Sequence, residues 1–537
     1  MSLFDWHSKV TIPSFNTTSC VALLSLYYLC YFYCLQVINK MAINPTKSIP
    51  AFFAGQSIFL TGATGFLGKS FIEKVLRSCP DVREIFVLIR PKKGLSVNQR
   101  LETILKLPLF DKLRETRASS FEKIIPISGN TTEKVLGLSA ADKQMLIERV
   151  TIIIHSAGSV KFNDSLKYAI FTNTRATRDI CILAQSMKNI KVLLYVSTAL
   201  TNIQEPFIEE KVYPPIFDWK KMIEVAELLD DEHVLNVFTA KFLESAANTY
   251  VFSKNLAESI IQEYSSSLPC AIVRPSLVYP SLTEPMPGWI DNIYGSIGLY
   301  IGGAKGIIHI AYADKHVCGK IVPIDIVIKV ILVVCWKIGL TTFTADSTLF
   351  VLNCVYQHSL TLEGETIIMQ NILKEEVPFE GKVWRTYKRI TDNYILYYIG
   401  SMLLHIFPAV LIDLALKCLG RQPMLLQLQR KLYVANLALF HFGSNDWKFD
   451  NTNKSLLIST IPLEDQDTFS FDYANCDIKE YYKNCVIGIK KYLLHEKMDI
   501  SRLHPLILRN KRVDLFASTI ETIIVFSMLW IIYKLIF

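Results

Sequence analysis

Hydrophobic and polar positions alternate in a regular rhythm along the first half of this 537-residue chain. Short apolar runs rich in β-branched residues are separated by longer stretches whose apolar positions recur every three to four residues, as in amphipathic helices. The short runs predict six strands, at Ser57–Thr61, Ile85–Arg90, Lys123–Ser128, Thr151–His155, Val192–Ser197 and Cys270–Arg274. Strands that alternate with helices predict an α/β fold with a Rossmann-type, doubly wound parallel sheet. Beyond Val383 the pattern becomes mostly helical.

Three glycines spaced three residues apart join the first strand to a helix predicted at Phe66–Leu76. Such a turn lets a pyrophosphate approach the backbone and places it at the helix N-terminus. The spacing differs from Gly-x-Gly-x-x-Gly, and a glycine motif alone can mark a simple turn. The flanking strand and helix favour a dinucleotide site. The predicted contacts in this turn are Gly62, Thr64, Gly65, Phe66 and Gly68.

The second predicted strand ends in a group of cations, namely Arg90, Lys92 and Lys93, and Arg100 follows on the next helix. A site selective for NAD usually carries an acidic residue here, which binds the ribose 2′-hydroxyl. Cations at this position instead pair with a 2′-phosphate. A solvated basic turn is the alternative interpretation. The group predicts NADPH as the cofactor.

Composition points to a membrane and away from nucleic acid. Hydrophobic residues make up 51% of the chain and the mean hydropathy is +0.28, so we expect part of it to meet a membrane. The net charge of +8 is spread along the chain, which suits anionic ligands and lipid headgroups and argues against a nucleic-acid partner. The 12 cysteines include no Cys-x-x-Cys pair, which indicates reduced thiols and no metal site.

Two segments have the length and composition of membrane spans. Cys20–Ile38 is uncharged and is followed by lysines, and Ala517–Phe537 closes the chain as a predicted tail anchor, although Glu521 interrupts its start. The flanking basic residues predict that the middle of the chain faces the cytosol. We favour the endoplasmic reticulum over the peroxisome because the tail ends with one lysine rather than a basic cluster.

A third apolar stretch, Tyr394–Leu416, carries His405, Pro408 and Asp413. Polar residues in the middle of a span are costly. We therefore expect a buried or interfacial helix pair here.

Candidate catalytic residues lie in two short segments. Ser197 and Thr198 end the fifth predicted strand, at the edge of the sheet where ligands usually bind. Tyr250 and Lys254 lie one helical turn apart, on one helix face. A lysine beneath a tyrosine is expected to lower the pKa of the phenol, so that the hydroxyl passes a proton at neutral pH. A surface tyrosine on a helix is the alternative interpretation.

Several motifs together give the chain a family resemblance. It resembles the alcohol-forming fatty acyl-CoA reductases, which belong to the extended short-chain dehydrogenase/reductase superfamily, through TGATGFLGKSFIEKVLRSCP, VLIRPKKG, IIHSAGSVKFND, YVSTAL, YVFSKNLAE, IVRPSLV and PMPGWIDN. The resemblance runs from about Ile49 to Met498. It implies reduction of a long-chain acyl-CoA to a primary alcohol through an aldehyde, with two NADPH.

The resemblance also implies roles for individual residues. Tyr250 is the expected general acid and Lys254 tunes it, while Thr198, or less favourably Ser197, binds the carbonyl oxygen. Arg90 meets the 2′-phosphate. The nicotinamide is backed by Pro275 and Ser276.

The same resemblance divides the chain into an N-terminal extension (1–48), an NADPH-binding reductase domain (49–382), a C-terminal domain (383–498) and the tail anchor (517–537). Several positions depart from the family pattern. Ser156, Gly158 and Lys161 are mild changes, and the most consequential one is Asn130, which stands where an aspartate is usual. Asparagine keeps the geometry and an acceptor, so we expect adenine binding to be altered rather than lost, with room for weak activity.

Two rival functions stay open on the sequence alone. A membrane-bound hydroxysteroid dehydrogenase would share the glycines, the Tyr–Lys pair and a span, but would not explain Pro287-Gly288-Trp289 or the C-terminal region. A pseudo-reductase that binds acyl-CoA without turnover is the other. The sequence leaves the preferred acyl chain length and the oligomeric state open.

Overall fold

The computed structural model describes residues 47–536 except 93, 203, 230–234, 236–238, 240, 244–245, 345, 357–359, 387–388 and 474–475. The predicted span Cys20–Ile38 lies outside the described residues.

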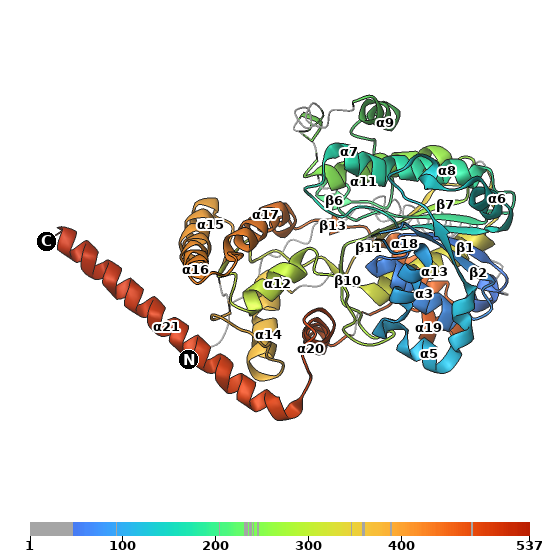
Figure 1. Ribbon diagram of the computed structural model, residues 1–537. Helices are drawn as coiled ribbons and strands as arrows, with labels where there is room; N and C mark the ends of the chain where they lie inside the picture. Colours follow the sequence, from blue (N-terminus) through green and yellow to red (C-terminus); the bar gives the residue numbers. More distant parts are fainter. Residues whose placement is uncertain are drawn as a thin grey trace, which may run out of the picture.

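A seven-stranded parallel sheet forms the centre of the first half of the molecule (Figure 1). Its strand order is β11-β7-β5-β4-β1-β2-β3. Successive strands are therefore added on one side of β1 up to β3 and on the other side from β4 onward, so the strand order reverses between β1 and β4. All six predicted strands are present, and β11 is an additional strand that was not predicted. The bounds are β1 (Ser57–Thr61), β2 (Glu84–Ile89), β3 (Ile124–Ser128), β4 (Ile152–His155), β5 (Val192–Val196), β7 (Cys270–Pro275) and β11 (Phe350–Cys354).

Helices cover both faces of this sheet, and each face has its own apolar core. Because the strands are buried on both sides, β1, β2, β5 and β7 are almost continuously apolar, as parallel strands usually are. One face packs against α2 (Ile49–Phe53), α3 (Phe66–Ser78) and α13 (Ile324–Leu340). The other packs against α6 (Ala140–Arg149), α8 (Ala176–Gln185), α9 (Trp219–Leu228) and α11 (Thr249–Tyr264). The predicted doubly wound sheet is thereby confirmed.

The second half is mostly helical, as predicted beyond Val383, and it contains two short strand pairs, of which the second also joins it to the first half. β9 (Ile310–Tyr312) pairs with β12 (Arg389–Thr391), and β6 (Phe207–Ile208) pairs with β13 (Lys448–Phe449). The helices of this half are α12 (Ser296–Ala304), α14 (Leu362–Glu375), α15 (Tyr394–Ser401), α16 (Phe407–Cys418), α17 (Leu425–Gly443), α18 (Thr452–Ser459), α20 (Ile478–Gly488) and α21 (Ile500–Ile536).

Two glycines allow the two halves to touch backbone to backbone. Gly288 has a φ of +75°, and a Cβ added to it would overlap the carbonyl oxygen of Asn484 in α20. A Cβ on Gly488 would in turn overlap the carbonyl oxygen of Gly288. Beside this contact, the ring of buried Trp289 packs edge-on against Tyr492, with 4.9 Å between centroids. The Pro-Gly-Trp motif is therefore the place where the C-terminal region docks.

The third apolar stretch is one continuous rod, Tyr394–Cys418, in which the π-helical turn Met402–Ile406 connects α15 to α16. Among the described residues, it is the one helix found to be long and apolar enough to cross a membrane. Only 22% of its apolar stretch is buried inside the protein, however. The buried alternative of that expectation is therefore wrong, and the interfacial alternative stays a prediction. The sequence misled because the polar residues of the rod have partners elsewhere: Asp413 accepts three backbone N–H groups at the start of α17.

Candidate active site

The glycine turn lies at the carboxyl end of β1, where the strand order reverses, and this is the usual ligand crevice of such sheets. Gly62 has a φ of +78°, and a Cβ there would lie 2.8 Å from the backbone nitrogen of Ala157. A Cβ on Gly68 would lie 2.6 Å from the Cα of Ala63, so this glycine lets α3 pack closely on the turn. Gly65 is the N-cap of α3, and among the described residues no side chain caps that helix end. Its first N–H groups therefore suit a pyrophosphate.

Thr64 and Phe66 flank Gly65 at this edge, and both are partly exposed, so they can contact a bound ligand. The structure thus brings all five predicted residues of the turn to one place.

Two arginines lie close together at the carboxyl end of β2. Arg90 directly follows the strand and is exposed, and Arg100 donates a hydrogen bond to the carbonyl oxygen of Arg90. Burial lowers the pKa of Arg100, and the neighbouring charge of Arg90 lowers it further. Two like charges held this close favour an anion between them.

Asn130 directly follows Gly129 at the end of β3, and its side chain forms hydrogen bonds with neighbouring residues of the turn that follows. Its Oδ1 accepts the backbone N–H of Thr132 at 3.2 Å, and its Nδ2 donates to Glu133 Oε1 at 3.2 Å. Because the side chain stabilises the turn that follows β3, the asparagine keeps this edge of the crevice ordered.

Thr198 and Ser197, adjacent in sequence, point to different partners. The hydroxyl of Thr198 is hydrogen-bonded to the phenol of Tyr250. Ser197 Oγ instead donates to Glu258 Oε1 at 2.5 Å. Glu258 is paired in turn with Arg274 at 2.6 Å, and both side chains are fully buried. Only Thr198 therefore shares the neighbourhood of Tyr250.

Tyr250 and Lys254 lie in the first two turns of α11, both buried, as their spacing predicted. The ammonium of Lys254 donates to the carbonyl oxygen of Val196 at 2.9 Å and lies 4.6 Å from the centroid of the Tyr195 ring. Burial lowers the pKa of Lys254 to about 8, although the charge of Glu258 opposes the shift. Lys254 thus lies beneath the end of β5 as a cation that burial has made easier to deprotonate.

The expectation that Lys254 lowers the pKa of Tyr250 is wrong in this arrangement. Burial raises the pKa of Tyr250 to about 12, and only the hydrogen bond with Thr198 opposes it. The physical reason is that the ammonium of Lys254 points at Val196 and not at the phenol. Tyr250 therefore stays protonated at neutral pH and can act as a proton donor.

Two buried residues that sequence reasoning missed position the centre of the site. Asn173 lies in the π-helical turn Ile170–Arg175, and its Oδ1 accepts the N–H of Ser159 at 2.9 Å while its Nδ2 donates to Ser253 Oγ at 2.9 Å. His155 ends β4 and bridges Thr61 and Thr177 through its two ring nitrogens. For His155 the available signal was a polar residue at the end of an otherwise apolar strand, whereas Asn173 lies among other polar residues and gave no such signal.

Pro275 and Ser276 lie at the end of β7, beside β5. The backbone N–H of Ser276 donates to Cys354 at 3.1 Å, but its buried Oγ has no partner among the described residues. An unpartnered buried hydroxyl costs free energy unless a ligand satisfies it. Together with the glycine turn and the arginine pair, it fits a nicotinamide dinucleotide lying across this edge.

Aromatic residues connect Tyr250 to the C-terminal region. The Phe162 ring lies 5.9 Å from the Tyr250 ring and 5.2 Å from the ring of Phe442, near the end of α17. Phe442 in turn lies 6.4 Å from buried Trp447. The catalytic candidates therefore adjoin an apolar wall that the second half of the chain supplies.

Comparisons with known sequences agree with this site. An NAD-binding family model described as "Male sterility protein" matches residues 60–331, and a second model with that description matches residues 404–496. Fatty acyl-CoA reductase 1 from Pongo abelii and that from Homo sapiens are each 38% identical to the chain over 469 residues, or 87% of this chain and 90% of the relative. Fatty acyl-CoA reductase 2 from Homo sapiens is 34% identical, over 84% of this chain and 87% of the relative.

Solved structures share the fold. The terminal R domain of the myxalamid PKS-NRPS pathway gives a TM-score of 0.56 at 18% identity, covering 86% of this chain and 99% of that domain. A reductase domain of a non-ribosomal peptide synthetase from Mycobacterium tuberculosis gives 0.54 at 18% identity, covering 84% and 95%. The sequence relatives go further than the fold, and they confirm the resemblance found in the motifs: this chain belongs to the fatty acyl-CoA reductase family, whose members are reductases with a nicotinamide cofactor.

Proposed function

We propose that this enzyme reduces long-chain acyl-CoA to a primary alcohol with NADPH, through an aldehyde that stays bound. The observation that carries the proposal is the cluster of Thr198, Tyr250 and Lys254 at the edge of the sheet that also holds the glycine turn. The names of the relatives supply the substrate class.

In the proposed mechanism, Tyr250 and Thr198 hold the carbonyl oxygen of the thioester between their hydroxyls. NADPH, when bound, supplies a hydride to the carbonyl carbon. Tyr250 gives its proton to the oxygen, which yields a hemithioacetal. Loss of the CoA thiol leaves an aldehyde, and a second hydride and proton give the alcohol. Each alcohol therefore consumes two NADPH and two protons and releases one free CoA.

Lys254 has a supporting role in this proposal. Its ammonium lies within α11, one turn from Tyr250, and is bound to the end of β5. From there its charged hydrogen bond to Val196 holds the first turns of α11, and with them Tyr250, against the end of β5. Asn173 fixes the Ser159 loop beside it and so keeps this arrangement rigid.

The choice of NADPH rests on the arginine pair. Arg90 and Arg100 converge at the end of β2, where the ribose 2′ position of a dinucleotide lies in sheets of this type. A 2′-phosphate would satisfy both guanidinium groups, whereas the 2′-hydroxyl of NADH would leave them facing each other. We also propose that Asn130 contributes to the adenine side of the site.

The acyl chain is proposed to run along the apolar wall beyond Tyr250. Phe162 and Phe442 begin this wall, and a small apolar cluster around Ala199, Trp447 and Phe449 continues it. The four-part division of the chain, the tail anchor and the cytosolic orientation at the endoplasmic reticulum, with the peroxisome as the alternative, belong to the same proposal. An apolar substrate is most accessible to an enzyme held at a membrane.

One experiment tests the proposed function. The purified full chain is incubated in detergent with NADPH and a series of saturated acyl-CoAs, and free CoA, aldehyde and alcohol are quantified. We expect alcohol and CoA in equal amounts, with two NADPH oxidised for each. Turnover of steroid substrates without acyl-CoA reduction would assign the chain to the hydroxysteroid rival. Acyl-CoA binding without NADPH oxidation would establish a pseudo-reductase.

A further inference from the structure

We propose that the rod Tyr394–Cys418 is a membrane-docking element that lies flat in one leaflet, with its outer face among the lipids and its inner face on the enzyme. The inference deepens the proposed function, on which it rests, because it states how the reductase reaches a membrane-dissolved substrate. The occupant of the surface is a phospholipid leaflet with anionic headgroups.

The outer face of the rod is a stripe of large apolar side chains. Six of them, spaced mostly four residues apart, are between 48% and 66% exposed: Ile395, Ile399, Leu403, Phe407, Leu411 and Leu414. Scattered apolar residues on a surface are ordinary, but a contiguous stripe along a 25-residue helix marks an interaction surface.

The inner face is offset by two residues from the outer one and is held by the body of the enzyme. It consists of buried residues at the same four-residue spacing: Tyr397, Ser401, His405, Ala409 and Asp413. These five positions stay on one face partly because the π-helical turn Met402–Ile406 has more residues per turn than an α-helix, which brings residues four apart closer to alignment. His405 accepts the backbone N–H of His309 at 2.7 Å, and the Tyr397 ring stacks on Tyr312 at 4.9 Å.

This attachment argues against a transmembrane orientation. The rod is attached to α17 at two places: Asp413 accepts the N–H groups that begin α17, and Tyr433 stacks on Tyr397 at 5.5 Å. If the rod spanned the membrane, α17 would therefore have to enter the bilayer as well. α17 carries exposed Arg430 and Lys431, which are costly inside hydrocarbon. A flat helix buries only one face, about 5–10 Å deep, at the boundary between headgroups and acyl chains.

Charges at the end of the rod favour the same placement. Lys417 and Arg421 are exposed where the rod ends, and Arg430 and Lys431 follow on α17. Cations beside an apolar stripe attract the anionic headgroups of a leaflet while the stripe enters it.

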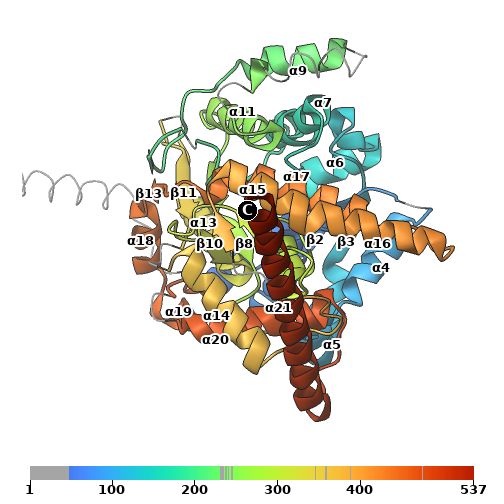
Figure 2. The ribbon, with the colours of Figure 1, turned by 90° about the vertical axis from the view of Figure 1, so that its left-hand side faces the viewer.

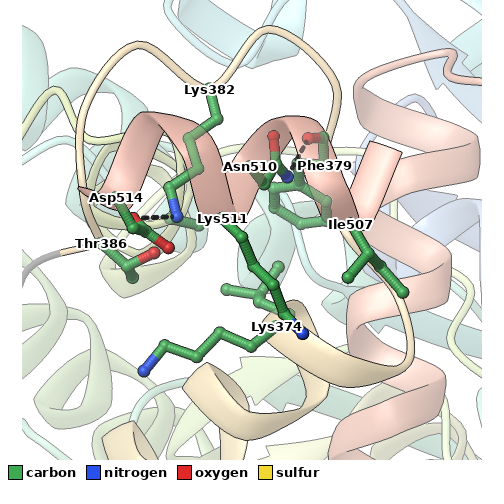
Figure 3. Close-up of a pocket in the computed structure, with 10 residues that line it drawn as sticks. Lys374, Phe379, Lys382, Thr386, Ile507, Asn510, Lys511 and Asp514 are labelled. Atoms are coloured by element: carbon green, nitrogen blue, oxygen red, sulfur yellow. Dashed lines mark hydrogen bonds and ion pairs between the residues drawn. The ribbon is translucent and has the colours of Figure 1, made fainter. Parts of the chain in front are cut away.

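The tail helix leaves the body from a fixed base and on the same side as the rod. Lys382 pairs with Asp514 at 2.6 Å, and Asn510 Nδ2 donates to the carbonyl oxygen of Phe379 at 3.1 Å, in a small cavity between α14, α21 and the loop that follows α14 (Figure 3). Farther along α21, Glu521 pairs with Arg385 at 2.5 Å and accepts from Trp384. These contacts fix the angle between tail and body.

The two ribbon views place both apolar elements on one side. In Figure 1, α15, α16 and the end of α21 lie on the side away from the parallel sheet, and in Figure 2 the end of α21 stands in front of α15. Towards the end of α21, Phe526 and Trp530 are large apolar side chains that are exposed as well. A membrane reached by the tail would therefore also meet the rod.

α17 connects this surface to the chemistry. It packs along the rod at Tyr433, and its other end carries Phe442, which adjoins Phe162 and so Tyr250. The docked rod thus lies over the same helix that borders the proposed acyl site. An acyl chain leaving the leaflet would follow α17 to the catalytic residues.

Depth measurement in vesicles tests the orientation without requiring activity. A small fluorescent amino acid replaces Ile399, Phe407 or Leu414, one at a time, in the full chain. Each protein is reconstituted into phosphatidylcholine vesicles containing phosphatidylserine, with a quencher attached to the lipid either near the headgroup or deep in the acyl chain. The control position is Leu463, which is 89% exposed on another part of the surface.

We expect all three rod positions to lose fluorescence with the shallow quencher and much less with the deep one, while position 463 responds to neither. Deepest quenching at position 407 with shallow quenching at 399 and 414 would show that the rod spans the membrane and would overturn the proposal. So would the absence of quenching at all three positions. A spectral shift that grows with protein concentration in the absence of vesicles would assign the stripe to a second copy of the chain.

A charged variant tests the functional consequence. Leu403→Glu combined with Leu411→Glu alters only exposed side chains, so we expect unchanged thermal unfolding and an unchanged kcat in detergent. With acyl-CoA presented in vesicles, KM should rise severalfold, whereas Leu463→Glu should leave it unchanged. An unaltered KM in vesicles would contradict delivery through the rod. If no variant has activity, the depth measurement still decides the orientation.

Discussion

The carboxyl edge of the sheet and the outer face of the rod distribute polarity in opposite ways. At the edge, Lys254, Glu258 and Arg274 are charged and buried, and each has a partner within 2.9 Å. On the rod, large apolar side chains are exposed. Both arrangements depart from the usual rule of apolar inside and charged outside, and such departures are the informative ones. We propose that the edge retains Lys254 because reduction needs its charge, and that the rod retains apolar surface because a leaflet covers it.

The largest effect is expected from removing the proton donor at the edge. Tyr250→Phe should lower turnover by about two to four orders of magnitude, because only the phenolic hydroxyl is lost. NADPH binding, measured by fluorescence titration, should stay near that of the parent enzyme. Tyr264→Phe, on the same helix but away from Thr198, serves as the control. Near-normal turnover of Tyr250→Phe would remove this residue from the mechanism.

The next prediction separates the two neighbouring hydroxyls. Thr198→Ala should reduce kcat by about 10²–10³, as the loss of one donor to a developing oxyanion usually does. Ser197→Ala should instead destabilise the fold by about 1.5–3 kcal/mol, because Glu258 loses a charged hydrogen bond, with little change in kcat. Thermal unfolding and steady-state kinetics of the two variants give the comparison. The reverse pattern would make Ser197 the substrate ligand.

A smaller effect is expected at the arginine pair. Arg90→Ala should weaken NADPH binding by about 1.5–3 kcal/mol and leave NADH nearly unaffected, because only NADPH has a 2′-phosphate to lose. Arg83→Ala, at the opposite end of β2, is the matched control because it removes the same charge from the same strand. Equal weakening of both cofactors by Arg90→Ala would mean that Arg90 binds something common to them.

The buried lysine predicts opposite pH trends for activity and stability. Because burial holds the pKa of Lys254 near 8, turnover that needs its charge should fall about tenfold for each pH unit above 8. In the unfolded chain the lysine keeps its proton up to its usual pKa near 10.5, so the unfolded state binds more protons between these values. Its contribution to the free energy of unfolding therefore rises with pH in that window.

A pH–rate profile and unfolding curves at matched pH values measure the two trends. Lys254→Arg keeps its charge throughout and should flatten both. If the pH–rate profile of the parent enzyme stays flat through pH 9, the charge of Lys254 is not needed for catalysis.

The smallest effect on chemistry is expected from removing the tail. Deletion of Ala517–Phe537 should lower the fraction of protein on membranes while leaving kcat in detergent unchanged, because no residue of the tail approaches Tyr250 in the described structure. If the rod docks as proposed, part of the truncated protein stays bound to anionic vesicles and is released by salt. Flotation of both forms makes the comparison, and identical distributions would contradict the tail anchor.

The sequence predicted the regular parts of the molecule well. β1 matches its predicted bounds, β2 is shifted by one residue at both ends, and the other four predicted strands differ by one residue at one end, because buried parallel strands are short apolar runs between turn residues. β11 was missed because it lies far along the chain from its neighbour β7 and follows the long helix α13. Sequence distance hides such pairings.

The site was predicted in its residue types but not in its interactions. Spacing placed Tyr250 and Lys254 on one face, yet could not show that the ammonium points at Val196. Nor could it separate Thr198 from Ser197, since both end the same strand and only burial beside Glu258 distinguishes them. The sequence likewise could not decide whether the rod is buried or interfacial, because the partners of His405 and Asp413 lie on other segments.

The contact between Gly288 and Gly488 constrains how enzymes of this family can be recombined. Each glycine leaves room for the backbone of the other half, so neither tolerates a side chain while its counterpart stays in place. A chimaera that takes its sheet from one relative and its C-terminal region from another must inherit both glycines and the spacing around each. Crossover points placed between residues 288 and 488 test that compatibility directly, whereas crossovers beyond residue 488 leave the contact intact and should be far more permissive.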